Sequence, residues 1–327
     1  MDNVSVVSMF TLSGLSGTAH YRVTLFILTL LCYCVIWMVN VTIIVTIIVD
    51  KNLHEPMYIF LCNLCINALY GTAGFYPKFL GDLLSASHVI SYSGCLLQGF
   101  VLHASVSADF SILVLMAYDR YVAICQPLIY HSVMTKGKIG MFVFFAWLVP
   151  HYLILVSTIT TAITKICGSH IPKIYCINHL VNRLACTPPL ATSIVPAFNY
   201  AVCLIYAVFV FWTYLCLIKT CLHSGENRSK FMQTCLPHLF CLNTFLISIL
   251  FDLSYVRYGT STIPQSLKNF MAIEFLVVPP ILNPLIYGLK LTKIRNRIIC
   301  IVNVVIMTVQ IQCTGGGHWY DVIAEIT

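Results

Sequence analysis

Residues 116–125 read MAYDRYVAIC and end an apolar run of about 20 residues. A helix needs about that length to cross the hydrocarbon core of a bilayer, and a charged side chain inside that core is costly. We therefore expect Asp119, Arg120 and Tyr121 to lie at a membrane boundary and to have a role there.

The composition is that of a membrane protein. Of the 327 residues, 59% are hydrophobic and 9% are charged, whereas soluble domains carry about 25% charged residues. The sequence shows no linker and no repeat of solenoid period, which indicates one polytopic domain. The formal net charge is +7, but the basic residues are scattered between apolar runs and form no basic face. We therefore expect no nucleic-acid partner.

Apolar runs with the length of a membrane crossing, or nearly that length, recur along the chain. They occupy residues 23–49, 57–80, 95–122, 139–164, 190–218, 231–254 and 269–289. The sequence therefore predicts an all-α membrane protein, a bundle of seven transmembrane helices. Residues 1–22 form a tail before the bundle, and residues 290–327 form a tail after it that begins with a short basic helix. Gly71, Gly74 and Pro77 predict a kink in the second helix.

Lysine and arginine predict the orientation of the bundle. With the amino terminus outside, 11 of the 18 lysines and arginines fall on the inner side, as the positive-inside rule favours. Asn3 then begins a glycosylation sequon in the extracellular tail. The same topology exposes four cysteines to an oxidising compartment, and the sequence alone does not choose how they pair. They are Cys95, Cys167, Cys176 and Cys186.

Several motifs, in order along these spans, resemble a known family. Asp119-Arg120-Tyr121, Trp147 in the fourth span and residues 283–287 (NPLIY) in the seventh resemble rhodopsin-like (class A) G-protein-coupled receptors. Within that class, four segments resemble the vertebrate odorant (olfactory) receptors. They are residues 53–58 (LHEPMY), 116–125, 230–239 and 280–284 (PILNP).

The resemblance implies two disulfides and an activation switch. Cys95 would pair with Cys176, holding the second outer loop to the third helix, and Cys167 would pair with Cys186 inside that loop as part of a lid. Asp119 would restrain Arg120 at rest, and activation would free Arg120 toward a G protein. The residues implied in this switch are Asp119, Arg120, Tyr121, Tyr214, Asn283, Pro284 and Tyr287.

Asp109 is an acid expected near the middle of the membrane. It precedes Arg120 by 11 residues, and 11 steps of about 100° return to nearly the same helix face, which points into the bundle. Two interpretations stay open. Asp109 is either a structural acid, hydrogen-bonded or protonated, or a sodium or proton site together with Asn67 and Asn283. Many receptors of this class carry an acid in the second helix, where this chain has Asn67 and Ala68.

The ligand site is expected in the outer half of the bundle, where apolar walls with few polar groups suit a small organic molecule. Residues 269–289 contain no lysine for a retinal Schiff base, and Leu102 stands where amine receptors carry an aspartate. An opsin and a monoamine receptor are thus disfavoured. For each candidate residue, ordinary helix packing is the alternative to ligand contact. The candidates are His103, Val106, Ser107, Phe110, Phe198, Cys203, Asp252, Tyr255, Ile273 and Val277.

Together these features predict an odorant-activated receptor in the plasma membrane, expected in the cilia of sensory neurons. Its expected partners are a small odorant, a heterotrimeric G protein of the stimulatory olfactory type and membrane lipids, with no cofactor and no metal. A rhodopsin-like receptor for a hormone or lipid would share the fold and differ at the pocket. A transporter or channel is less consistent, because the halves do not match. The sequence lacks the phosphate-binding, zinc-binding and serine-nucleophile motifs of enzymes.

Overall fold

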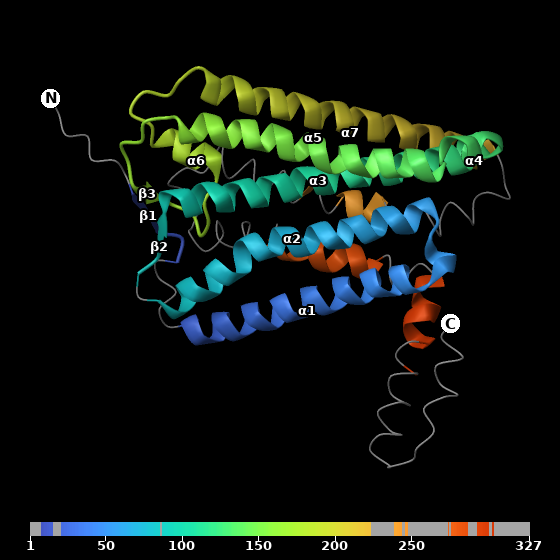
Figure 1. The fold of residues 1–327 in the computed structure, drawn as a ribbon, viewed down its shortest axis with the longest axis horizontal. Helices are drawn as coiled ribbons and strands as arrows, with labels where there is room; N and C mark the ends of the chain where they lie inside the picture. Colours follow the sequence, from blue (N-terminus) through green and yellow to red (C-terminus); the bar gives the residue numbers. More distant parts are fainter. Residues whose placement is uncertain are drawn as a thin grey trace, which may run out of the picture.

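The computed structural model describes a bundle of long helices with a small sheet at one end (Figure 1). The described residues are 8–15, 21–85, 87–223, 239–243, 246–247, 274, 276–286, 293–300 and 303. Within them, five helices are long and apolar enough to cross a membrane. These are α1 (Arg22–Val49), α2 (Pro56–Leu84), α3 (Tyr92–Cys125), α5 (Lys136–Ala162) and α7 (Ala191–His223).

Each of the first five predicted spans falls on one of these helices. The sixth predicted span, 231–254, lies mostly outside the described residues, which include 239–243 and 246–247 of it. The seventh, 269–289, contains the shorter apolar helix Leu276–Ile286. The α2 helix is uninterrupted through Gly71, Gly74 and Pro77, where the sequence predicted a kink, and its ribbon bends along its length (Figure 1).

Local sequence explains where several helices begin. Pro56 occupies the first turn of α2, where its missing N–H is not needed. The Ser91 hydroxyl accepts a hydrogen bond from the Gly94 N–H at the start of α3, at 3.1 Å. Thr135 does the same for Lys138 at the start of α5, at 3.4 Å. These caps satisfy backbone donors that a helix leaves unpaired.

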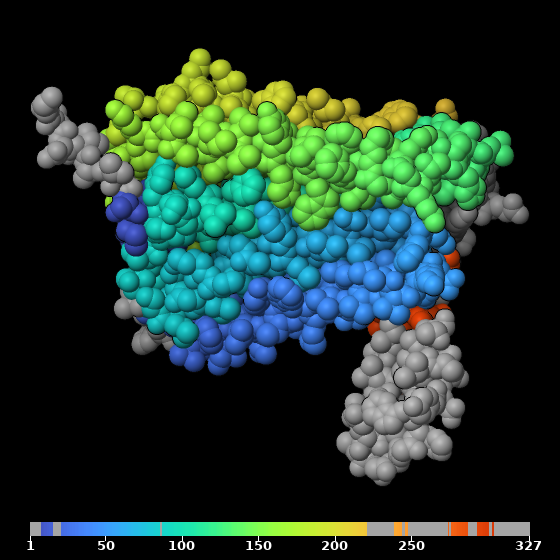
Figure 2. Space-filling view, viewed as in Figure 1, coloured from blue at the N-terminus to red at the C-terminus, as the bar shows by residue number. Residues whose placement is uncertain are grey.

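The α3 helix is the centre of the bundle, because it contacts α2, α5 and α7, while α1 packs on α2 and reaches the segment 276–286, where Asn40 Nδ2 donates to the Pro280 carbonyl at 3.0 Å. Figure 2 shows α1, α2, α3 and α5 side by side across one face of the molecule. Large apolar side chains on α1, α5 and α7 are exposed, including Trp37, Phe144 and Phe211. Such a surface is suited to contact with lipid.

Short elements connect the helices at both ends of the bundle. At one end, β1 (Met9–Leu12) lies between β2 (Val89–Ser91), to which it is antiparallel, and β3 (His170–Ile171), to which it is parallel. This sheet and α6 (Asn178–Arg183) cover that end of the helices (Figure 1). At the other end lie η2 (Lys51–Leu53), η3 (Pro127–Ile129) and α4 (Tyr130–Val133).

Close approach of α2 to α3 depends on Gly71. A Cβ added there would meet the Ser105 hydroxyl and lie 2.8 Å from Ser105 Cβ. Gly81, on the same helix, has no atom within 4 Å of such a Cβ. We expect Gly71→Ala to lower the free energy of unfolding by about 1–3 kcal/mol through overpacking. Gly81→Ala should raise it by up to about 1 kcal/mol, through helix propensity.

The measurement is the thermal denaturation midpoint of each solubilised full-length variant. A Gly71→Ala protein as stable as the Gly81→Ala protein would contradict the close approach of the two helices.

Candidate ligand cavities and activation switch

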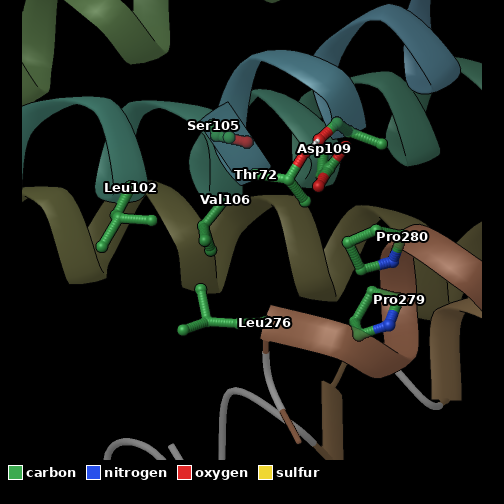
Figure 3. Close-up of a pocket in the computed structure, with 10 residues that line it drawn as sticks. Thr72, Leu102, Ser105, Val106, Asp109, Leu276, Pro279 and Pro280 are labelled. Carbon is green, nitrogen blue, oxygen red and sulfur yellow. Dashed lines mark hydrogen bonds between the residues drawn. The ribbon is translucent and has the colours of Figure 1, made fainter. Parts of the chain in front are cut away.

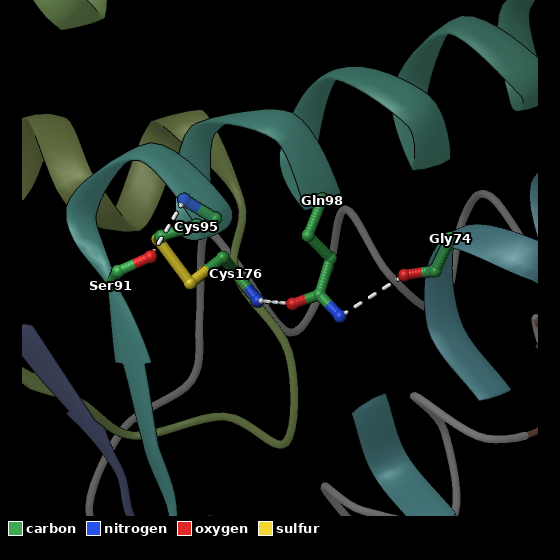
Figure 4. Close-up of a disulfide and its surroundings, with 6 residues drawn as sticks. Gly74, Ser91, Cys95, Gln98 and Cys176 are labelled. Carbon is green, nitrogen blue, oxygen red and sulfur yellow. Dashed lines mark hydrogen bonds between the residues drawn. A yellow bond between two sulfur atoms is a disulfide. The ribbon is translucent and has the colours of Figure 1, made fainter. Parts of the chain in front are cut away.

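A disulfide and a glutamine fix the lid to the helices (Figure 4). Cys95, in the first turn of α3, is bonded to Cys176, and Cys167 is bonded to Cys186 within the loop. Gln98 Oε1 accepts a hydrogen bond from the Cys176 N–H at 3.0 Å. Its Nε2 donates to the Gly74 carbonyl on α2 at 3.2 Å. Both cysteine pairs that the family resemblance implied are therefore bonded in the structure.

A first cavity, here called the α2–α3 cavity, lies between α2, α3 and the segment 276–286 (Figure 3). Its open volume is about 30 Å³. Most of the lining is apolar, and Asp109 supplies the one carboxylate among the described lining residues. The lining residues are Ala68, Gly71, Thr72, Leu102, Ser105, Val106, Asp109, Leu276, Pro279 and Pro280.

Asp109 is held by an amide of the neighbouring helix. Asn67 Nδ2 donates to Asp109 Oδ1 at 2.7 Å and to the Ser105 carbonyl at 2.7 Å. Asn283 is buried and lines an adjoining space with Asn40 and Asp109. The side-chain oxygens of Asn40, Asn67 and Asn283 accept no hydrogen bond in the described part of the chain. The structure therefore gathers the three predicted residues of the sodium or proton site, with oxygen atoms that remain able to accept.

A second cavity, the α3–α5–α7 cavity, lies on a different face of α3 from the first cavity. Val106 and Asp109 line the first cavity, whereas Ser107 and Phe110, one position further along α3, line the second. Its open volume is also about 30 Å³. The lining residues are Ser107, Phe110, Ser111, Val149, Pro150, Leu153, Ile154, Asn199, Val202, Cys203 and Tyr206.

An ion pair lies near the end of α3 that is opposite the lid. Arg120 Nε donates to Asp119 Oδ2 at 2.9 Å, and Arg120 Nη2 makes a further short contact with the same oxygen. The Tyr130 hydroxyl donates to the other carboxylate oxygen at 2.9 Å. Asp119 is 0% exposed, so both of its oxygens are paired away from water. Burial and the charge of Asp119 raise the pKa of Tyr130, which keeps its hydroxyl protonated as a donor.

Comparison with known proteins identifies the family. The family model "Olfactory receptor" matches residues 29–304. The chain belongs to the olfactory receptor family. It is similar to mouse olfactory receptor 6E1, with 32% identity over 90% of this chain and 95% of the relative. It is also similar to olfactory receptor 1D5 from Pan paniscus, with 34% identity over 88% of this chain and 93% of the relative. Human olfactory receptor 4Q2 is 32% identical over 90% of this chain and 93% of the relative.

Family membership confirms the predicted fold class, a seven-helix membrane bundle, and the prediction that the receptor is not an enzyme. The receptor is therefore an odorant-activated, G-protein-coupled signalling protein of the membrane, as its sequence predicted.

The structure places the predicted ligand residues of this receptor unevenly. Val106 lines one cavity, and Ser107, Phe110 and Cys203 line the other. Phe198 lines neither cavity, and its side chain is 59% exposed, so its place in the ligand site stays a prediction. His103 and Val277 are half-buried and line neither cavity. Asp252, Tyr255 and Ile273 lie outside the described residues, as does Asn3, the predicted glycosylation site.

The other residues of the predicted switch lie near the ion pair or below the α2–α3 cavity. The Tyr121 ring packs on Trp212 of α7 at 5.1 Å, and Tyr214 is buried in the core. Asn283 and Pro284 line the space beside Asp109. Tyr287 lies outside the described residues.

Acids before α2 pair with bases of the segment 293–300. Lys293 Nζ donates to Glu55 Oε1 at 2.7 Å, and this hydrogen bond raises the pKa of Lys293. Arg297 Nε lies 3.3 Å from Asp50 Oδ2. The two ion pairs hold the start of the predicted inner tail against the first inner loop, close to where α3 ends.

The sequence did not predict the contact between Tyr130 and Asp119, which are 11 residues apart. The contact arises because the chain turns back through η3 and α4 after the end of α3. If Asp119 restrains Arg120, Tyr130→Phe should weaken that restraint, since a hydrogen bond to a charged group contributes about 1.5–3 kcal/mol. We expect agonist-free cyclic-nucleotide output of cells expressing this variant to rise several-fold at equal surface expression. The control is Tyr152→Phe, which changes an exposed tyrosine on α5. Equal basal output from the two variants would contradict a role for Tyr130.

Proposed function

We propose that this receptor binds a small odorant beside α3, beneath the disulfide-bonded lid, and activates a heterotrimeric G protein of the stimulatory olfactory type. Family membership carries the general assignment. One observation supports the mechanism: α3 is a continuous helix from Tyr92 to Cys125 that lines both cavities and ends in the Asp119–Arg120 pair. A ligand that displaces α3 from its neighbours therefore acts on the same rigid element that carries the ion pair.

The switch that we propose is an ion pair with two arrangements. At rest Asp119 is bonded to Arg120 and Tyr130. In the active arrangement Arg120 leaves Asp119 and faces the G protein, with Tyr214 and Tyr287 as rearranging partners. Such a pair near water can shift between partners at modest cost, whereas the same charges deeper in the bilayer could not.

Asp109 is proposed as a site for a proton or a sodium ion that favours the resting arrangement. Carboxylate and amide oxygens are suitable ligands for a hard cation. The amide oxygens of Asn67 and Asn283, which accept no hydrogen bond from the residues that the structure describes, support such a site. A proton on Asp109 would also favour the resting arrangement, in which this carboxyl group is buried, because protonation removes the cost of a buried charge.

The proposed surroundings of the receptor follow from its charges. The bases at the inner end, including Lys293 and Arg297, would attract anionic lipids and an acidic surface of the G protein. We propose the plasma membrane of sensory cilia as its location and Asn3 as its glycosylation site.

The first test removes the restraint on Arg120. Asp119→Asn should raise agonist-free cyclic-nucleotide output by about tenfold, because the ion pair and a charge-assisted hydrogen bond are both weakened. Glu55→Gln is the control, since the Glu55–Lys293 pair is more than half exposed and such pairs contribute little. Unchanged basal output of Asp119→Asn at normal surface expression would refute the switch.

The second test fills the α2–α3 cavity. For the odorant of a broad volatile panel that gives the largest response, Val106→Phe should raise the half-maximal concentration by at least about tenfold. The reason is that the larger ring occupies the space the ligand needs. Leu204→Ile, at an exposed position on α7, should leave the concentration unchanged. A Val106→Phe receptor with wild-type sensitivity would contradict a ligand in this cavity, and a panel without any receptor-dependent response would contradict the odorant assignment.

A further inference from the structure

Two hydrogen-bonding oxygens in the α3–α5–α7 cavity have no protein partner. Ser111 Oγ, on α3, and Asn199 Oδ1, on α7, are buried and make no hydrogen bond within the described part of the chain. The Ser111 residue is 4% exposed. A buried polar group without a partner costs free energy, so native structures rarely retain one without a reason.

The chemistry of these atoms specifies what can satisfy them. An amide oxygen only accepts hydrogen bonds, so Asn199 Oδ1 requires a donor, whereas the Ser111 hydroxyl can donate and accept. A matching group must therefore carry an O–H or N–H. No charged side chain is among the described residues that line this cavity, so an ionised group would lack a counter-charge.

The rest of the lining requires an apolar body. Phe110, Val149, Leu153 and Ile154 line the cavity together with the two oxygens, as does Pro150 of α5. The open volume of about 30 Å³ accepts a hydroxyl or a methyl group without rearrangement. The open space therefore admits the polar end of a ligand, and the surrounding side chains suit its apolar body.

We propose that the α3–α5–α7 cavity binds neutral ligands that carry a hydroxyl on an apolar body, and that Ser111 and Asn199 recognise this hydroxyl. Aldehydes, ketones, ethers and esters accept hydrogen bonds but do not donate them, so they leave Asn199 Oδ1 unsatisfied. The inference rests on the proposed function only for its consequence in signalling, because binding at this cavity can be measured without a G protein.

The test uses full-length receptor in lipid nanodiscs and an octanol that carries a photoreactive diazirine. After irradiation, mass spectrometry of peptides should locate the label on residues 149–154 and 199–206. An excess of 1-hexanol should compete with the label at least about tenfold more effectively than hexyl methyl ether, which has the oxygen but no donor. This comparison uses the unaltered receptor, so it does not depend on the folding of a variant.

A double variant tests the two residues directly. Ser111→Ala combined with Asn199→Leu should reduce labelling of these peptides at least about tenfold, while Ser193→Ala, an exposed serine on α7, should not reduce it. Three results would overturn the inference: no label at this cavity, equal competition by the ether and the alcohol, or full labelling of the double variant. The first of these is expected if the two oxygens bind only an ordered water.

The signalling readout separates this inference from the proposed function. Label at the cavity with no response of the cells to any odorant supports the site and contradicts the proposed function. A response to odorants without label at the cavity supports the proposed function and overturns the site.

Discussion

The Asp119–Arg120 ion pair is the interaction on which the other features depend, because a charge in a bilayer is costly unless it is paired or reaches water. We propose that it fixes where α3 meets the inner membrane boundary. The opposite end of α3 is fixed by the Cys95–Cys176 disulfide, which limits the freedom of the lid. Between these two constraints α3 is a continuous helix that lines both cavities. The proposed ligand contact and the proposed switch thus share one rigid element.

The polar groups inside the bundle divide into two kinds. Some have protein partners that fix the packing of the helices, as when Trp147 Nε1 donates to Asn63 Oδ1 at 3.1 Å. Others, such as Ser111 Oγ and Asn199 Oδ1, have none in the described residues and lie at a cavity. Because water is scarce in this environment, the second kind indicates where a ligand or an ordered water is needed. The same reasoning singles out Asn283 beside Asp109.

The helices were predictable from sequence because length and apolar composition alone determine a membrane crossing. The direction in which each side chain points was not. Helices that are apolar all round lose the periodic signal that distinguishes lipid from core, so the sequence did not reveal that the Phe198 side chain is 59% exposed. The contact of Tyr130 with Asp119 depends on the path of a loop, and the strand Met9–Leu12 is too short to show an alternating pattern. Motifs of the family, rather than spacing, indicated the cysteine pairs.

The central claim is that α3 crosses the membrane with its lid outside and its charged pair inside. Epitope tags inserted separately after Pro188 and after Ser132 test it directly, by antibody staining of intact and of permeabilised cells that express the full-length receptor. We expect antibody to stain the first tag on intact cells and the second tag only after permeabilisation. Staining of the second tag on intact cells would place Asp119 and Arg120 on the exterior and contradict the account.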